Sequence, residues 1–166
     1  MEHHWPLPRI VTGKERKLIG RKIKMSLANS RTSELWRSFM PERTMISNKV
    51  SNEFISMRVY PEPLRIEDAK QEFERWAAVE VSSFEGTPAG MESFILDGGL
   101  YAVFDYKGSN TDIRIFIYIF TEWLPNSIYE LDERPFFEVL GDKYKNGDPE
   151  SEEEIWIPVK PKSFLS

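Results

Sequence analysis

The length, charge and composition of the chain exclude several kinds of protein at the outset. The 166 residues carry a net charge of −5 and no cysteine, so disulfides, thiolate nucleophiles, zinc fingers and iron–sulfur clusters cannot form. Hydrophobic residues make up 40% and aromatic residues 13% of the chain, which indicates a globular protein. No apolar run approaches the roughly 20 residues that a membrane span requires.

Histidine is equally limiting, because the only two, His3 and His4, stand together at the amino terminus. A Ser-His-Asp triad or an imidazole metal site is therefore not expected, and acid–base chemistry must use carboxylates, tyrosines or lysines. We predict neither a metal nor a cofactor. The first residues lack the order of a secretory signal, which together with the missing cysteine predicts a cytoplasmic protein.

The amino half predicts a strand, a helix and two further strands, in that order. The first strand is KLIGRKIKMSL, and the basic run from Lys14 to Lys24 is interpreted as its solvated face rather than as a nucleic-acid site, because the protein is acidic overall. RTSELWRSFMP follows as a helix with Ser30 as its N-cap. EFISMRVY and RWAAVEVSS complete this half as strands.

The carboxyl half predicts the same order of elements. A strand over Leu100–Tyr106 follows the turn residues Asp97-Gly98-Gly99. TDIRIFIYIFTEWLP then has apolar residues at helical spacing, with Asn110 or Thr111 as N-cap and Pro125 at its end, although its β-branched run would also suit a buried strand. Two strands complete the half, over Pro135–Leu140 and Glu154–Val159.

The repeated order predicts an internal duplication within one domain that spans 1–166. LWRSFMP and IFTEWLP each close on an apolar pair and a proline, and Pro41 and Pro125 lie about half the chain apart. We therefore predict an α+β fold of two β-α-β-β modules, over about 10–83 and 92–161, each with an antiparallel sheet that the other helps to cover.

A carboxylate stands among apolar residues in PFFEVLGDKY. In a strand, Phe136, Glu138 and Leu140 share one face and Phe137 and Val139 the other, so neither face is polar. Burying an isolated carboxylate costs several kcal/mol, so Glu138 must pair, accept hydrogen bonds or take up a proton. One interpretation is a salt bridge to Arg134 or Lys143, or an edge strand open to water; the other is a binding site for a positive partner.

Four segments of the carboxyl half resemble GyrI-like domains, a family that includes the effector-binding domains of AraC-type and MerR-type multidrug regulators. They are GLYAVFDYKG (99–108), TEWLPNSIYEL (121–131), RPFFEVLGDKY (134–144) and ESEEEIWIPVKP (150–161). The resemblance implies that the two modules are pseudo-symmetric, with a ligand cleft between them. It also implies that Glu138 lies in an aromatic pocket and receives cationic, lipophilic compounds.

Six aromatic residues are candidates to line such a pocket, since aromatic faces attract cations. We expect only some of them to contact a ligand, because rings at this spacing usually belong to the core. They are Trp123, Tyr101, Tyr118, Trp156, Trp36 and Phe39.

The favoured function is binding without turnover: the protein senses or sequesters amphipathic, cationic small molecules. The alternative, also implied by the resemblance, is a cofactor-independent hydrolase of cyclopropane-bearing toxins with Glu138 as general base and Trp123 or a tyrosine placing the electrophile. A third is inhibition of DNA gyrase through protein contact. The modules leave no room for a DNA-binding helix-turn-helix, so direct nucleic-acid contact is not expected, whereas a regulator could read the liganded state.

Overall fold

Nine strands and two helical segments make up residues 5–163, the part of the chain that the computed structural model describes. All the strand pairs are antiparallel, which confirms the α+β class. His3 and His4 lie outside the described residues. The strands are β1 (Arg9–Gly13), β2 (Arg16–Met25), β3 (Phe54–Val59), β4 (Phe73–Val81), β5 (Glu92–Leu96), β6 (Gly99–Lys107), β7 (Tyr129–Leu131), β8 (Phe136–Leu140) and β9 (Glu152–Pro161).

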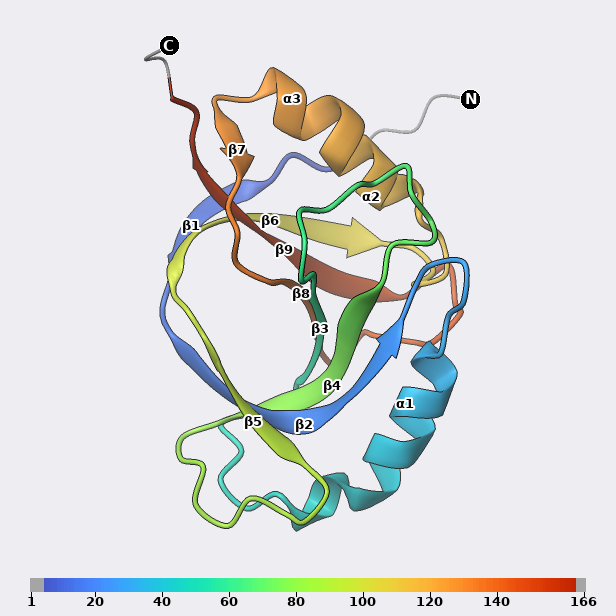
Figure 1. The fold of residues 1–166 in the computed structure, drawn as a ribbon, viewed down its shortest axis with the longest axis vertical. Helices are drawn as coiled ribbons and strands as arrows, with labels where there is room; N and C mark the ends of the chain where they lie inside the picture. Colours follow the sequence, from blue (N-terminus) through green and yellow to red (C-terminus); the bar gives the residue numbers. More distant parts are fainter. Residues whose placement is uncertain (1–4, 164–166) are drawn as a thin grey trace.

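The sheet curls back on itself because the chain bends within it at two places, between β1 and β2 and between β5 and β6 (Figure 1). Each of these pairs of strands runs as one long strand with a bend in it. Only two residues separate β1 from β2, and only two separate β5 from β6. The bent strands pair on both sides of the bends, where Gly13 faces Gly99 and Arg16 faces Leu96. The order β1-β6-β9-β8-β3-β4-β2-β5 therefore has its two ends joined through the chain, with β7 added beside β9.

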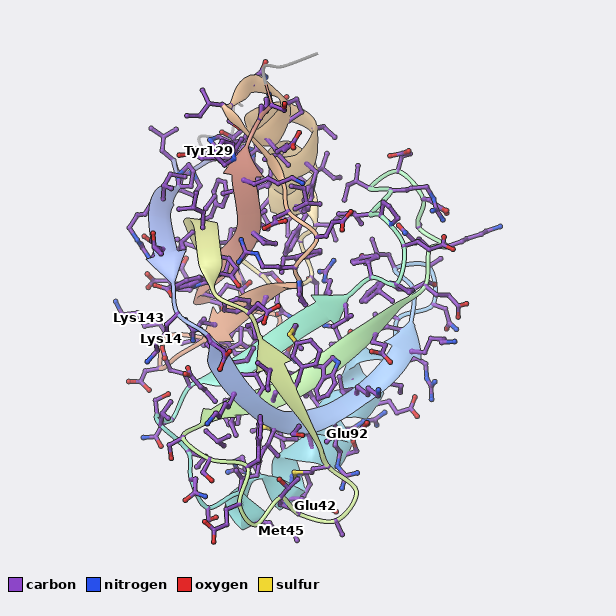
Figure 2. All side chains as sticks on the ribbon, turned by 60° about the vertical axis from the view of Figure 1, so that its left-hand side comes forward. Lys14, Glu42, Met45, Glu92, Tyr129 and Lys143 are labelled. Atoms are coloured by element: carbon purple, nitrogen blue, oxygen red, sulfur yellow. The ribbon has the colours of Figure 1, made fainter. Side chains whose placement is uncertain are left out.

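Both helical segments pack on the outer face of this curved sheet. The first runs through α1 (Thr32–Phe39) into the 3-10 helix η1 (Met40–Met45), and the second through α2 (Arg114–Tyr118) and the π-helical η2 (Ile119–Trp123) into α3 (Leu124–Asn126). Glu42 and Met45 of η1 lie at the end of the molecule opposite Tyr129 of β7 (Figure 2). No helix within residues 5–163 is long and apolar enough to cross a lipid bilayer.

The predicted N-caps of both helices are wrong. The N-cap residues are Arg31 and Ile113, and neither makes a side-chain capping bond. Asn110 instead uses its side-chain oxygen to accept a 2.7 Å hydrogen bond from the Gly147 backbone N–H, which ties the β6–α2 loop to the β8–β9 loop. The β-branched segment nevertheless forms a helix, because Ile115 and its neighbours at helical spacing pack onto the sheet.

Three apolar clusters result from the alternation of side chains along the strands. One fills the inside of the curved sheet and contains Met57, Trp76 and Phe137. The other two lie on the outer face, one under α1 with Leu35 and one under α2 with Phe116. In Figure 1, β3 and β8 run through the middle of the sheet between the two helical segments. Side chains on the outer face of β3 and β8 therefore lie between the two helical cores.

Close strand packing predicts that Gly20→Ala destabilises the fold. A Cβ at Gly20 would stand 2.1 Å from the Ala77 carbonyl oxygen and 2.7 Å from the Ala78 side chain, and the backbone cannot move aside in the middle of the β2–β4 pair. We expect a loss of about 3 kcal/mol in the free energy of unfolding, measured by urea denaturation. Gly141→Ala is the control, since its Cβ would meet only the Glu53 carboxylate, at 3.5 Å. Equal stability of the two variants would contradict the prediction.

Candidate functional site

Glu138 lies on the outer, helix-bearing face of β8 and is only 5% exposed. Its neighbours in the paired strands are Ser56 and Ile155, so it shares its face with the core under α2. The salt bridge considered from the sequence is not formed, because Arg134 pairs with Asp132 and donates a second hydrogen bond to the Leu100 carbonyl oxygen. Other charged residues meet Glu138 instead.

A buried charge cluster of Arg58, Arg75, Glu138 and Glu153 assembles from four adjacent strands. Arg58 and Arg75 are register partners in β3 and β4, while Glu153 lies two residues from Ile155, the register partner of Glu138. The strand alternation thus places all four side chains on the outer face, between the helical cores. Arg58 Nη2 lies 3.9 Å from Glu138 Oε1. Glu153 is 7% exposed and Arg58 8%, whereas Arg75 is half-buried.

Burial strongly shifts the pKa of two members of the cluster, Glu153 and Arg75. Burial raises the pKa of Glu153 to about 10, with further contributions from the charge of Glu138 and a hydrogen bond to it. Burial and the charge of Arg58 lower the pKa of Arg75 to about 10, so this guanidinium stays positive at neutral pH. At neutral pH these shifts favour a neutral carboxyl group on Glu153 and a positive guanidinium on Arg75.

Aromatic rings enclose the Arg58 guanidinium. The Cζ atom of Arg58 lies 4.7 Å from the ring centroid of Phe116 and 5.3 Å from that of Phe136. Phe73 is the third ring, at 5.6 Å. We call these three phenylalanines the aromatic box. Tyr60 stacks on two of its members, with centroids 4.8 Å from Phe73 and 5.8 Å from Phe136. The arrangement is a cation–π site with a carboxylate beside it.

The hydrogen bonding of the cluster is incomplete. Three of its buried atoms, Arg58 Nε, Arg75 Nε and Glu153 Oε2, make no hydrogen bond, and neither does Ser56 Oγ of the register partner of Glu138. A buried polar network that serves only stability is normally satisfied throughout, so orphaned atoms gathered in one place point to a site for another molecule. Tyr60 and Tyr144 beside the cluster are half-buried, as is Arg75, so the cluster is partly accessible to solvent on the side of Arg75.

The six aromatic residues predicted from the sequence are distributed over all three apolar clusters. Tyr101 and Trp156 lie inside the curved sheet, each within 5.6 Å of the Phe137 ring and on the opposite face from Glu138. The other four lie on the outer face. Those in the α1 core are Trp36 and Phe39, and those that pack against the core of the aromatic box are Tyr118 and Trp123.

The sequence analysis missed the arginines and Glu153 as site residues. The strands that contain Arg58 and Arg75 were predicted correctly. The sequence of one strand, however, does not indicate which of its two faces lies on the same side of the sheet as Glu138. Glu153, Ile155 and Ile157 are two residues apart along β9 and so lie on the same face of the strand. This spacing was the signal in the sequence that Glu153 is buried. The predicted strand began at Glu154, two residues later than β9 does, and Glu153 was interpreted as part of a solvated strand entry.

A second boxed arginine lies on the inner face of the sheet. Arg16 donates a 3.0 Å hydrogen bond to Glu80, and its guanidinium lies 5.1 Å from the Phe137 ring and 4.9 Å from the Trp156 ring. This pair has the hydrogen bond that Arg58 and Glu138 lack. It therefore serves as an internal comparison for the charge cluster.

A surface hollow lies at the end of β6, and none of the four cluster residues lines it. It has a volume of about 450 Å³, and Trp5, Asp105, Tyr106 and Arg114 contribute to its lining. Tyr106 is the register partner of Glu153, and burial together with the charges of Asp112 and Glu153 raises its pKa to about 12. Within residues 5–163, no group of three or more His, Asp or Glu side chains is placed to hold a metal ion.

Comparisons with solved structures identify similar folds at low sequence identity. The C-terminal domain of EcmrR matches with a TM-score of 0.72 and 15% identity over 95% of this chain and 99% of that one. SAV2435 bound to tetraphenylphosphonium matches with a TM-score of 0.63 and 16% identity over 96% and 94% of the two chains. A hydrolase from Listeria innocua matches with a TM-score of 0.60 and 8% identity over 94% and 93%. No curated protein sequence matches the chain.

The fold is that of GyrI-like proteins, and a family model matches the chain, which confirms the resemblance seen in the sequence. A family model described as an integron-associated effector binding protein, Cass2, matches residues 9–159. The chain therefore belongs to this family of effector-binding proteins.

Proposed function

We propose that the protein binds lipophilic organic cations at the charge cluster and thereby senses or sequesters them. The single observation that carries the proposal is the placement of Arg58, a planar cation enclosed by the aromatic box and facing the carboxylate of Glu138. The same rings and carboxylate suit a delocalised organic cation, because cation–π attraction and Coulomb energy both increase when water is excluded. The half-buried Arg75, Tyr60 and Tyr144 offer the shortest path inwards.

The comparisons support this proposal at the level of ligand class. The family is named for effector binding, and SAV2435 is described as bound to tetraphenylphosphonium, a lipophilic cation. Of the rings predicted from the sequence, Tyr118 and Trp123 pack against the core that contains Phe116 and Phe136, so they are the ones we place nearest a ligand. We propose that Tyr101 and Trp156 do not contact the ligand, because they lie on the opposite face of the sheet from Glu138.

The test compares two probes of the same shape and opposite charge, tetraphenylphosphonium and tetraphenylborate. Tetraphenylphosphonium at ~100 times its Kd should stabilise the protein by about 2.7 kcal/mol, which raises Tm by roughly 5–10 °C for a chain of this size. Tetraphenylborate should produce a much smaller shift, which thermal unfolding at matched concentrations would detect. Equal shifts for the two ions, or a larger one for the borate, would contradict a cation site.

Hydrolysis is the second candidate, because the cluster pairs a carboxylate with a protonated carboxyl group. Glu138 would act as general base on water and Glu153, whose pKa burial raises to about 10, as general acid. The similar fold of the Listeria innocua hydrolase is consistent with this chemistry. Incubation with a cyclopropane-bearing electrophile and mass spectrometry of the products tests it; saturable binding without product would exclude it. A protein partner, such as a regulator or DNA gyrase, stays a prediction.

A further inference from the structure

We infer that Arg58 is an internal occupant of the cation site, so that an external cation binds only in exchange with this guanidinium. The inference rests on the proposed function and adds the rule by which the site selects its ligands. Arg58 has the chemistry of such a ligand: a flat, delocalised cation, weakly hydrated for its charge, with its face available to aromatic rings. Its guanidinium has three rings within 5.6 Å and the Glu138 carboxylate at 3.9 Å.

The guanidinium is attracted to the site but is not anchored there. A structural arginine normally donates short, often paired hydrogen bonds to a carboxylate, at about 2.7–2.9 Å. The 3.9 Å separation between Arg58 Nη2 and Glu138 Oε1 is too long for a hydrogen bond, and Arg58 Nε is buried without a partner. Arg16 provides the contrast, because it pairs with Glu80 at 3.0 Å.

The neighbouring charges also favour exchange. Arg75 is the register partner of Arg58, and the positive charge of Arg58 is the second largest cause of the lowered pKa of Arg75. Both arginines face the same two carboxyl groups, and the raised pKa of Glu153 makes it the weaker partner for a cation. Withdrawal of Arg58 would relieve this repulsion while Arg75 stays beside the two carboxyl groups. A ligand cation could then occupy the aromatic box without adding a positive charge to the cluster.

Exchange implies a threshold for ligand size. A small cation such as tetramethylammonium brings little apolar surface and cannot replace the contacts that Arg58 makes with three rings. A cation that carries several aromatic rings gains enough apolar burial to displace the side chain. The site should therefore select polyaromatic, charge-delocalised cations and reject small ammonium ions, although both carry one positive charge.

The direct test measures tetraphenylphosphonium binding by calorimetry to the wild type, Arg58→Met and Arg58→Lys. If the aromatic box is occupied by Arg58 for about 90% of the time or more, its removal should tighten binding by roughly tenfold or more. Arg58→Lys should also tighten binding, because the shorter-reaching ammonium keeps the charge but leaves the rings largely uncovered. If Arg58 opposes the ligand only through charge repulsion, Arg58→Met should bind tetraphenylphosphonium more tightly and Arg58→Lys should bind it with wild-type affinity. That result would overturn the inference.

The control variant is Arg16→Met, which removes the boxed arginine of the inner face and should leave tetraphenylphosphonium affinity unchanged.

A second measurement uses the wild type and so does not depend on how the variants fold. The Arg58 Nε–H NMR signal, assigned with Arg58→Lys, should become exposed to solvent exchange when tetraphenylphosphonium is added. A signal that stays protected while the probe binds overturns the exchange. If the wild type and all variants fail to bind the probe, the proposed function fails as well; wild-type binding without tightening refutes the exchange alone.

Discussion

Glutamine in place of Glu138 alone is expected to leave most of the preference for tetraphenylphosphonium over tetraphenylborate intact, whereas Glu138→Gln/Glu153→Gln abolishes it. Glu153 holds its proton because of burial, the charge of Glu138 and the hydrogen bond between the two groups. Replacing Glu138 removes the last two causes. Arg75 and Arg58, which act to lower the pKa of Glu153, then oppose burial alone. We expect Glu153 to ionise and to supply the negative charge that Glu138 has lost.

The measurement is the ratio of the two affinities in the wild type, the two single variants and the double variant, by calorimetry at pH 7. The ratio should fall by less than about threefold in each single variant and by tenfold or more in the double variant, because strongly coupled titrating groups act as a unit. Glu80→Gln, which breaks the Arg16 pair on the inner face, is the control and should not change the ratio. A complete loss of preference in Glu138→Gln would show that Glu153 does not replace it.

The elements of the fold could be predicted from the sequence because each predicted element follows one period. Alternation identified β2, β3, β4, β6, β8 and β9, and helical spacing identified the segment that forms α2 and η2. β1 and β5 were missed for one physical reason: each continues a neighbouring strand across a bend of two residues. In the sequence, Lys14-Glu15 and Asp97-Gly98 resemble ordinary breaks, and only the pairing across both bends shows that the strands continue.

The site could be predicted only in part, because its members come from strands distant in sequence. The apolar surroundings of Glu138 marked it as unusual, and the strand period correctly placed it on the same face as Phe136. Its partner Arg58 is determined by the pairing of β3 with β8, a contact between the two halves of the chain. No local pattern specifies that register. The prediction of one aromatic pocket also combined rings from both faces of the sheet, since faces can be assigned within a strand but not between strands.

The protonated carboxyl group of Glu153 predicts that stability decreases as the pH rises above 6, and that Glu153→Gln removes this dependence. In the folded protein Glu153 keeps its proton up to a pKa of about 10, whereas in the unfolded chain it ionises at the ordinary glutamate pKa of 4.5. Between these values the folded state holds one proton more than the unfolded state, so the free energy of unfolding falls by up to about 1.4 kcal/mol per pH unit. The stabilising contribution is complete below pH 4.5 and is lost by about pH 10.

Urea denaturation at several pH values between 6 and 9 measures this slope. Glutamine stays neutral in both states, so Glu153→Gln should give a nearly constant free energy of unfolding and should exceed the wild type in stability at pH 8–9. The shifts of Arg75 and of Tyr106 and Tyr144 lie at pKa values of about 10 and 12, above the measured range. Glu67→Gln, which removes an exposed carboxylate, should retain the wild-type slope. If the wild type shows no decrease over this range, Glu153 is ionised in the folded protein and the cluster carries two negative charges instead of one.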